Sequence, residues 1–181
     1  MSKRWPAAAK RRPERDSDYD GMHTRYIDGL RIRTLRNGDT DTVEALFARL
    51  GPRSREQRFC GAKPRLTDAE LTALAHVDRD HHVLVGYLDD DPQPVGMARL
   101  ARVGATAEVA FEVADDYQGR GIGSILAREL AADARASGIR ELVATICGDN
   151  RRSVSLLKSV AKSLRVSEYG RERKFVVGLE A

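Results

Sequence analysis

A glycine-rich segment in the middle of the chain has the composition of a phosphate-binding loop. It occupies residues 118–124 and reads Gln-Gly-Arg-Gly-Ile-Gly-Ser, between a predicted strand and a predicted helix. Successive backbone N–H groups in such a loop can point into one concavity, and the helix N-terminus adds partial positive charge. Glycine is needed because a Cβ would keep a diphosphate away from the backbone, and Arg120 can add a charge-assisted contact. We therefore predict a phosphate-bearing ligand, with a glycine-rich turn that binds nothing as the alternative.

Two familiar phosphate-binding loops do not fit this segment. The dinucleotide-binding fingerprint needs its third glycine where this chain has Ser124, and it opens a βαβ unit instead of following antiparallel strands. The P-loop needs Gly-Lys-Ser or Gly-Lys-Thr, and neither tripeptide occurs in the sequence. The segment therefore indicates another class of phosphate ligand.

Hydrophobic periodicity predicts a mixed α/β (α+β) domain around this loop. Alternating apolar and polar residues predict strands at residues 30–35, 83–88, 95–103, 106–114, 142–147 and 174–179. Apolar residues at helical spacing predict helices that begin near residues 43, 55, 67, 122 and 150, the last of them reaching Leu164. The three strands between residues 83 and 114 must be antiparallel, because their connections are too short for crossovers. We expect one mixed, mostly antiparallel sheet with helices on its faces.

The first 28 residues are expected to form a flexible charged tail, and residues 29–181 a single domain. The net charge is +4, but six basic residues and one acidic residue lie in residues 1–15, which leaves 25 basic and 26 acidic residues in 16–181. A nearly neutral domain disfavours a dedicated nucleic-acid-binding protein. No apolar run approaches the ~20 residues that span a bilayer, so we expect no membrane association.

The sequence contains two cysteines, Cys60 and Cys147. They are too few for a disulfide framework or a zinc site, so we expect two separate thiols in a reducing, cytoplasmic location. Cys147 lies among aliphatic residues of a predicted strand and is expected to be a small core residue. The adjacent His81 and His82 would face opposite sides of a strand and could not bind one metal ion together. We predict no metal site.

The glycine-rich segment and its flanks resemble the GNAT superfamily of N-acetyltransferases. The signature of that family is Gln/Arg-x-x-Gly-x-Gly/Ala, which Gln118, Gly121 and Gly123 match. The strand at residues 107–114 looks like the family's motif A, and residues 150–153 (Asn-Arg-Arg-Ser) resemble its second cofactor motif. The resemblance implies the GNAT fold, with a mostly antiparallel central sheet and helices on both faces. It also implies acetyl-CoA as the cosubstrate.

Matching the family's motifs residue by residue places the cofactor on this chain. The family binds the diphosphate of acetyl-CoA on backbone N–H groups of the loop and pairs the pantetheine arm with the preceding strand, as an added edge strand would pair. Gly119 stands at a variable position of the motif. The resemblance implies the following cofactor-binding residues: Phe111, Val113, Gln118, Gly119, Arg120, Gly121, Ile122, Gly123, Ser124, Asn150 and Ser153.

Acetyl transfer to an amine requires a base, because a lysine ammonium with a pKa of ~10.4 is almost wholly protonated at pH 7. Glu108 and Glu112 lie four residues apart on one predicted strand, so they share a face with roughly 13 Å between them. Lysine acetyltransferases of the superfamily often carry their base in an Ala-Glu-apolar-apolar context, which residues 107–110 match. Glu108 is therefore the first candidate and Glu112 the second. The alternative is that both are solvated carboxylates.

Many relatives place a tyrosine in the helix after the second motif, as the general acid for the departing thiolate. The matching position here is Leu157, and residues 150–165 contain no tyrosine. Tyr117 and Tyr169 are the candidate replacements. Because a thiolate is a fair leaving group unaided, turnover does not require an acid.

Residues 50–59 (Leu-Gly-Pro-Arg-Ser-Arg-Glu-Gln-Arg-Phe) indicate the acceptor. They resemble a stretch of bacterial protein-lysine acetyltransferases that modify acyl-CoA synthetases. The resemblance implies direct transfer, in a ternary complex, to a lysine of a protein such as an acyl-CoA synthetase. Two alternatives stay open: a small-molecule amine acetyltransferase, and a non-catalytic acetyl-CoA-binding module, which the missing tyrosine favours.

Overall fold

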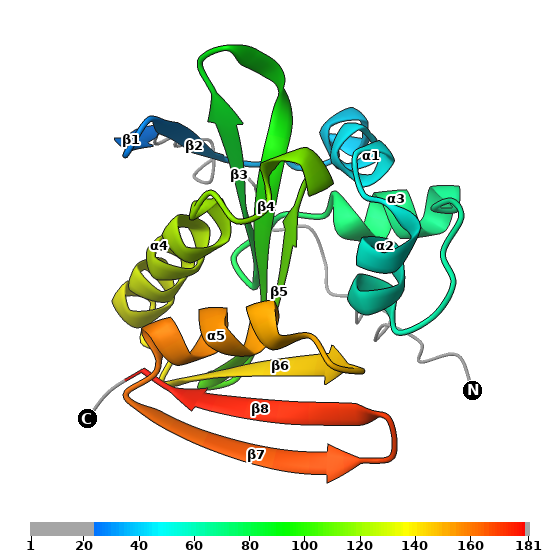
Figure 1. The fold of residues 1–181 in the computed structure, drawn as a ribbon. Coiled ribbons are helices and arrows are strands. Elements are labelled where there is room, and N and C mark those ends of the chain that lie inside the picture. The colour runs from blue at the N-terminus through cyan, green and yellow to red at the C-terminus, as the bar shows by residue number, and fades with distance from the viewer. Residues whose placement is uncertain (1–23, 180–181) are drawn as a thin grey trace.

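The structure is a computed structural model that describes residues 24–179 (Figure 1). In chain order its elements are β1 (Arg25–Ile27), β2 (Leu30–Thr34), α1 (Thr40–Ala48), α2 (Pro52–Phe59), α3 (Asp68–Leu74), β3 (His81–Leu88), β4 (Asp91–Val103), β5 (Thr106–Val113), the short 3-10 helix η1 (Asp115–Tyr117), α4 (Ile122–Ala136), β6 (Glu141–Cys147), α5 (Arg151–Val160), β7 (Ser163–Tyr169) and β8 (Glu172–Gly178).

The strands form one mixed sheet in the order β1-β2-β3-β4-β5-β6-β8-β7. Every neighbouring pair is antiparallel except β5 and β6, which are parallel. The predicted meander of β3, β4 and β5 is confirmed, with His81 opposite Ala101 and Ala101 opposite Glu108. These three side chains therefore share one face of the sheet.

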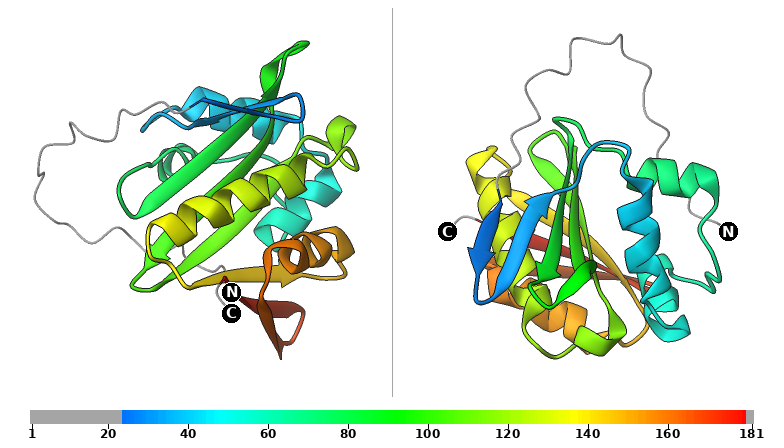
Figure 2. Two further views of the ribbon diagram at one scale, coloured as in Figure 1. Left: turned by 90° about the vertical axis from the view of Figure 1, so that its left-hand side faces the viewer. Right: turned by 90° about the horizontal axis from the view of Figure 1, so that it is seen from above.

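Helices cover both faces of this sheet, as predicted (Figure 2). On one face, α4 and α5 cover a core that contains Leu126, Leu130 and Leu157. On the other face, a second core contains Leu46 of α1 and Met97 of β4, with residues of α3 packed against it. Helix α2 lies on this second face and buries none of its residues.

Local signals in the sequence determine where the helices begin and end. A capping box opens α3 at the predicted start near residue 67, because the Thr67 side chain accepts a hydrogen bond from the N–H of Glu70 and the Glu70 side chain accepts one from the N–H of Thr67. Gly138, with a φ of +74°, follows the end of α4, where a left-handed residue terminates a helix readily.

Within residues 24–179 no helix combines the length and the apolar character needed to cross a bilayer.

The strands β5 and β6 separate soon after they meet. They pair only between Thr106–Glu108 and Glu141–Val143 and then diverge (Figure 1). The outer edge of β5 stays paired with β4 as far as Val113, and the outer edge of β6 stays paired with β8 as far as Cys147. The sheet therefore opens between the two inner edges without losing the pairing on either side.

Two predicted boundaries are wrong. Strand β1 lies inside the segment expected to be a flexible tail, and it pairs with β2 through the left-handed turn at Asp28 and Gly29. The domain therefore begins before residue 29, while residues 1–23 lie outside the described range. The last helix ends at Val160, and Leu164 belongs to β7, which pairs with β8. Strand pairing with β8 overrides the helical spacing of Leu164.

The contact between α4 and the sheet supports a stability prediction. Leu126 lies on the buried side of α4 and is completely buried, so Leu126→Ala should lower the free energy of unfolding by about 2–5 kcal/mol through lost burial and a new cavity. Arg128 on the exposed side of the same helix is the control, and its replacement by alanine should change stability by less than about 0.5 kcal/mol. Urea denaturation measures both variants. Equal effects would contradict this packing.

Candidate functional site

A cavity of about 1510 Å³ lies where β5 and β6 diverge. Its walls are the facing parts of the two strands, the loop before α4 and the start of α5, together with α2 and α3 on the other side. This volume exceeds the ~300–1,000 Å³ typical of small-ligand pockets. The cavity therefore has room for an extended cofactor and for the group that reacts with it.

The predicted glycine loop borders this cavity at the N-terminus of α4. Gly119 and Gly121 have φ values of +80° and +84°, which side chains rarely adopt, and Gly121 is the N-cap without a side-chain cap. The N–H groups of the first turn of α4 have no intrahelical acceptor, so they are available to an anion. Gly123 lies close to α5, because a Cβ there would lie 2.9 Å from Cδ1 of Leu156 and that side chain would have to shift.

Most of the predicted loop residues line the cavity, and Arg120 does not. Gln118, Gly119, Gly121, Ile122, Gly123 and Ser124 are in the wall. The guanidinium of Arg120 instead stacks on Tyr117, 4.8 Å from the ring centre. Its expected contact with a phosphate is therefore not prepared in this conformation.

Gln118 connects the loop to its surroundings. Its side-chain amide donates hydrogen bonds to Oγ of Ser54 in α2 (3.1 Å), to the carbonyl of Val113 (3.2 Å) and to Oδ1 of Asp115 (3.2 Å). Its carbonyl accepts one from Arg152 of α5 (2.5 Å). Gln118 thus holds the loop against the end of β5, α2 and α5, and so determines where the loop lies.

The start of α5 also borders the cavity, next to the glycine loop. Asn150 caps this helix by accepting a hydrogen bond from the N–H of Ser153 (3.1 Å), and both residues line the cavity. Arg151 and Arg152 also line it. Our sequence reasoning did not select these two arginines, although their position inside the second cofactor motif was a usable signal.

The inner edge of β5 offers free backbone groups to the cavity. Because β6 pairs only as far as Glu108, residues 109–113 have no strand partner on that side within residues 24–179. Phe111 and Val113 line the cavity and pack against the core beneath α4. An extended ligand can hydrogen-bond to such an edge as an added strand would.

The two candidate carboxylates occupy different environments. Glu108 is exposed within the cavity, and no hydrogen bond or ion pair joins its carboxylate to another described residue. Glu112 is only 7% exposed and pairs with Arg58 of α2 (2.7 Å) and Arg99 of β4 (3.5 Å). Burial raises the pKa of Glu112, but the charges and hydrogen bonds of the two arginines outweigh this effect and lower the pKa. Burial also lowers the pKa of Arg99, to about 10.

The end of the cavity near Glu108 carries imidazole groups. His81 shares the face of Glu108, with Ala101 of the intervening strand between them. The carboxylate of Asp78 forms hydrogen bonds with a ring nitrogen of His76 (2.9 Å) and one of His81 (2.8 Å). Burial raises the pKa of Asp78, but these contacts and two backbone N–H groups lower it to about 2. The spacing His-x-Asp-x-x-His was visible in the sequence, and our reasoning did not use it.

The position that matches the family's tyrosine is occupied by a core residue, Leu157. Leu157, on the buried side of α5, is 1% exposed and belongs to the core. The hydroxyl of Tyr117 donates a hydrogen bond to Asp91 (2.7 Å), and this bond raises the pKa of Tyr117. Tyr117 lines the cavity, but its hydroxyl is engaged with Asp91.

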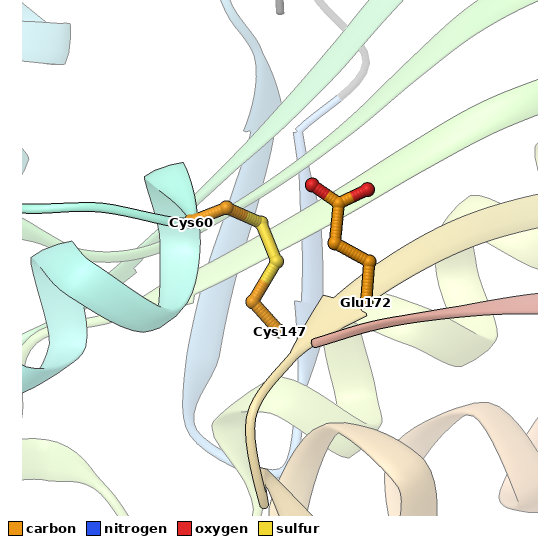
Figure 3. Close-up of side chains that lie close together, drawn as sticks. All are labelled: Cys60, Cys147 and Glu172. Atoms are coloured by element: carbon orange, nitrogen blue, oxygen red, sulfur yellow. A yellow bond between two sulfur atoms is a disulfide. The ribbon is translucent and has the colours of Figure 1, made fainter. Parts of the chain in front are cut away.

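Cys60 and Cys147 form a disulfide beside the cavity (Figure 3), so the prediction of two separate thiols is wrong. Their Cα atoms are 5.4 Å apart, although 87 positions separate them in the chain. Cys60 is exposed and lines the cavity, whereas Cys147 is half-buried at the end of β6 and is not the core residue we expected. The expectation of a reducing compartment loses its support, because it rested on free thiols.

Comparison with known proteins agrees with this geometry. Residues 46–161, which include the loop and both carboxylates, match the model of the Acetyltransferase (GNAT) family. The chain is 31% identical over 137 residues to "Acetyltransferase PA5475" of Pseudomonas aeruginosa, covering 73% of this chain and 70% of that protein. It is 42% identical over 88 residues to "Acetyltransferase Pat" of Mycolicibacterium smegmatis, covering 46% of this chain and only 26% of that protein.

Solved structures share the fold. The GNAT domain of S. lividans PAT superposes with a TM-score of 0.75 and 25% identity, covering 83% of this chain and 90% of that one. The yncA protein of Salmonella typhimurium, solved with acetyl-CoA, superposes with a TM-score of 0.61 and 21% identity, covering 84% and 95%. Together with the opened sheet and the glycine loop, these matches show that the chain belongs to the GNAT family and is an acetyl-CoA-dependent acetyltransferase.

Proposed function

We propose that the protein acetylates the side-chain amine of a protein lysine by direct transfer from acetyl-CoA, with Glu108 as the general base. The observation that carries this proposal is the position of Glu108 on β5, exposed inside the cavity at the point where β5 and β6 begin to diverge. A carboxylate there can reach a thioester that lies between the strands.

The cofactor would run along the opened sheet. Its diphosphate would bind the N–H groups at the start of α4, with Arg151 and Arg152 near enough to add charge-assisted contacts. Its pantetheine arm would pair with the inner edge of β5 beside Phe111 and Val113. This path directs the thioester toward Glu108.

The environments of the two carboxylates favour Glu108 as the base. A base must accept a proton at neutral pH, and Glu112 is held in its charged form by two buried guanidinium groups. Glu108 would accept the proton directly or through water, and an N–H group on the inner edge of β5 would stabilise the tetrahedral oxyanion. The CoA thiolate would then leave without a tyrosine acid, since Leu157 is in the core.

Two observations support a lysine acceptor. Residues 50–59 resemble a stretch of bacterial protein-lysine acetyltransferases, and the chain is similar to proteins named Pat or PAT. The cavity also leaves the Glu108 side chain exposed, so a carboxylate is accessible to an ammonium on a long flexible stem. An acyl-CoA synthetase is the first protein acceptor to test.

Replacing Glu108 tests the proposed base. Glu108→Gln should lower kcat/KM by about 10²–10⁴-fold, the usual contribution of general base catalysis, and leave the dissociation constant of acetyl-CoA unchanged. Steady-state CoA release and calorimetry measure the two quantities. Glu44→Gln on the exposed side of α1 is the control and should retain full activity. Full activity of the Glu108 variant would remove this residue from the mechanism.

Replacing Glu112 should mainly affect the stability of the folded protein. Glu112→Gln leaves two buried guanidinium groups without a counter-charge and should lower the free energy of unfolding by about 3–5 kcal/mol in urea at pH 7. Since the pKa of Glu112 is lowered by folding, the wild type gains this stability above the ordinary glutamate pKa of about 4.3 and loses it as the pH falls through the lowered pKa. A stability of Glu112→Gln equal to that of the wild type at pH 7 would argue against this role.

A matched pair of variants tests the diphosphate site. Asparagine and aspartate both tolerate the left-handed φ of Gly121 and have similar shapes. Gly121→Asp should bind acetyl-CoA at least about fivefold more weakly than Gly121→Asn, because like charges ~4 Å apart repel by ~1 kcal/mol even in water. Titration calorimetry compares the two. Equal affinities would place the diphosphate elsewhere.

The acceptor itself is tested by a CoA-release screen with an acyl-CoA synthetase, other lysine-bearing proteins and small amines. We expect mass spectrometry to locate the acetyl group on a lysine of a protein. Acetylation of small amines alone would favour the small-molecule alternative. Binding of acetyl-CoA without CoA release in any reaction would favour the non-catalytic module.

A further inference from the structure

The Cys60–Cys147 disulfide joins two elements that border the cavity from different sides. Cys60 is the C-cap of α2 and has a left-handed backbone with a φ of +57°. Cys147 is the last residue of β6, beside the opening of the sheet. Figure 3 shows the bond between the end of α2 and the end of β6, with Glu172 of β8 next to it.

Helix α2 has little else to hold it in place. None of its residues is buried, and its aromatic contact with the core is the edge-on packing of Phe59 against Phe47, with 5.9 Å between the ring centres. Its other described attachments come from polar side chains: Ser54 accepts from Gln118, Arg55 donates to the carbonyls of Phe47 and Pro64, and Arg58 pairs with Glu112. The disulfide is the covalent attachment, and it lies two positions after Arg58.

The face that α2 covers is the one that carries Glu108. Glu108 and Glu112 are four positions apart on β5 and point the same way, and Arg58 reaches Glu112 from α2. The end of α2 therefore lies over the side of the cavity from which an amine would approach Glu108. A movement of this end changes the width of that approach.

We propose that Cys60 and Cys147 are a reversible thiol–disulfide site that fastens α2 over the acceptor side of the cavity. In the disulfide form α2 is tied to β6 and the approach is narrow. In the dithiol form the end of α2 is held by noncovalent contacts only, and the approach widens. The consequence for turnover rests on the proposed function, whereas the redox site itself does not.

The reactant is a dithiol reductant. One of its thiolates attacks Sγ of Cys60, the exposed partner, so the bond to Cys147 breaks and Cys147 leaves as a thiolate that takes up a proton. The second thiol of the reductant, as its thiolate, then attacks the mixed disulfide and releases the Cys60 sulfur, which is protonated in turn. Two electrons pass to the protein, and the reductant becomes a disulfide.

Alkylation and hydrogen exchange test the site on the full chain, with dithiothreitol as the probe. Protein purified without reductant should show no alkylated cysteine after unfolding, and two after treatment with dithiothreitol. Amide exchange in residues 52–61 should become several-fold faster on reduction, while exchange in α4 stays the same. Cys60→Ser and Cys147→Ser should each show the fast exchange in residues 52–61, and adding dithiothreitol should not change it further.

The contrary outcomes are equally clear. Two alkylated cysteines after exposure to a disulfide-forming oxidant such as diamide would overturn the site. A zinc ion bound by Cys60, Cys147 and Glu172 in native mass spectra would overturn it too, because these three groups lie within 4.8 Å of one another. Unchanged exchange in residues 52–61 would show that the bond does not hold α2.

Activity separates this proposal from the proposed function. Reduction should raise kcat/KM for a protein acceptor several-fold without changing the affinity for acetyl-CoA, and the serine variants should match the reduced protein. If the exchange of α2 responds and kcat/KM does not, the bond does not control acceptor access. If neither form acetylates any amine, the proposed function fails, while alkylation and exchange still decide the redox site.

Discussion

The separation of β5 and β6 is the constraint on which the site depends. Two parallel neighbours that pair at only three positions leave a row of backbone donors and acceptors inside the molecule. Such groups are tolerated only where water or a ligand satisfies them. The antiparallel partners β4 and β8 keep the outer edges paired, so the sheet opens without coming apart. The N-termini of α4 and α5 then meet at the wide end of the opening, where their free N–H groups face the same space.

This arrangement explains why two glutamates on one face of one strand differ so strongly. Glu112 lies where α2 crosses β5 and is enclosed by Arg58 and Arg99. A buried ion cluster of this kind adds little net stability compared with apolar packing, but it is strongly destabilised when one partner is lost. Its effect is to hold α2 in register with β5. Glu108, nearer the point of divergence, is beyond the reach of these arginines and faces open cavity.

Helix α2 differs from its neighbours in how it is attached. Helices α4 and α5 are held by extensive apolar contacts, whereas α2 buries none of its residues and relies on one aromatic contact, ion pairs, hydrogen bonds and one covalent bond. Polar attachments of a surface helix break at lower free energy than a packed core. The wall proposed to hold the cofactor therefore has the stronger attachment to the core, and the wall proposed to face the acceptor has the weaker one.

Short-range information in the sequence was sufficient for most of the fold and for the loop. Residues 118–124, the capping box at Thr67 and the tight connections of β3, β4 and β5 act through neighbours a few positions away, so their spacing alone indicated a loop, a helix start and a meander. Leu164 and the strand at residues 25–27 were misplaced, because pairing with distant strands determines their conformation. The contrast between Glu108 and Glu112 and the bond between Cys60 and Cys147 were equally out of reach. A charge environment and a covalent contact depend on which side chains the folded sheet brings within a few ångströms, and the order of residues along the chain does not contain that distance.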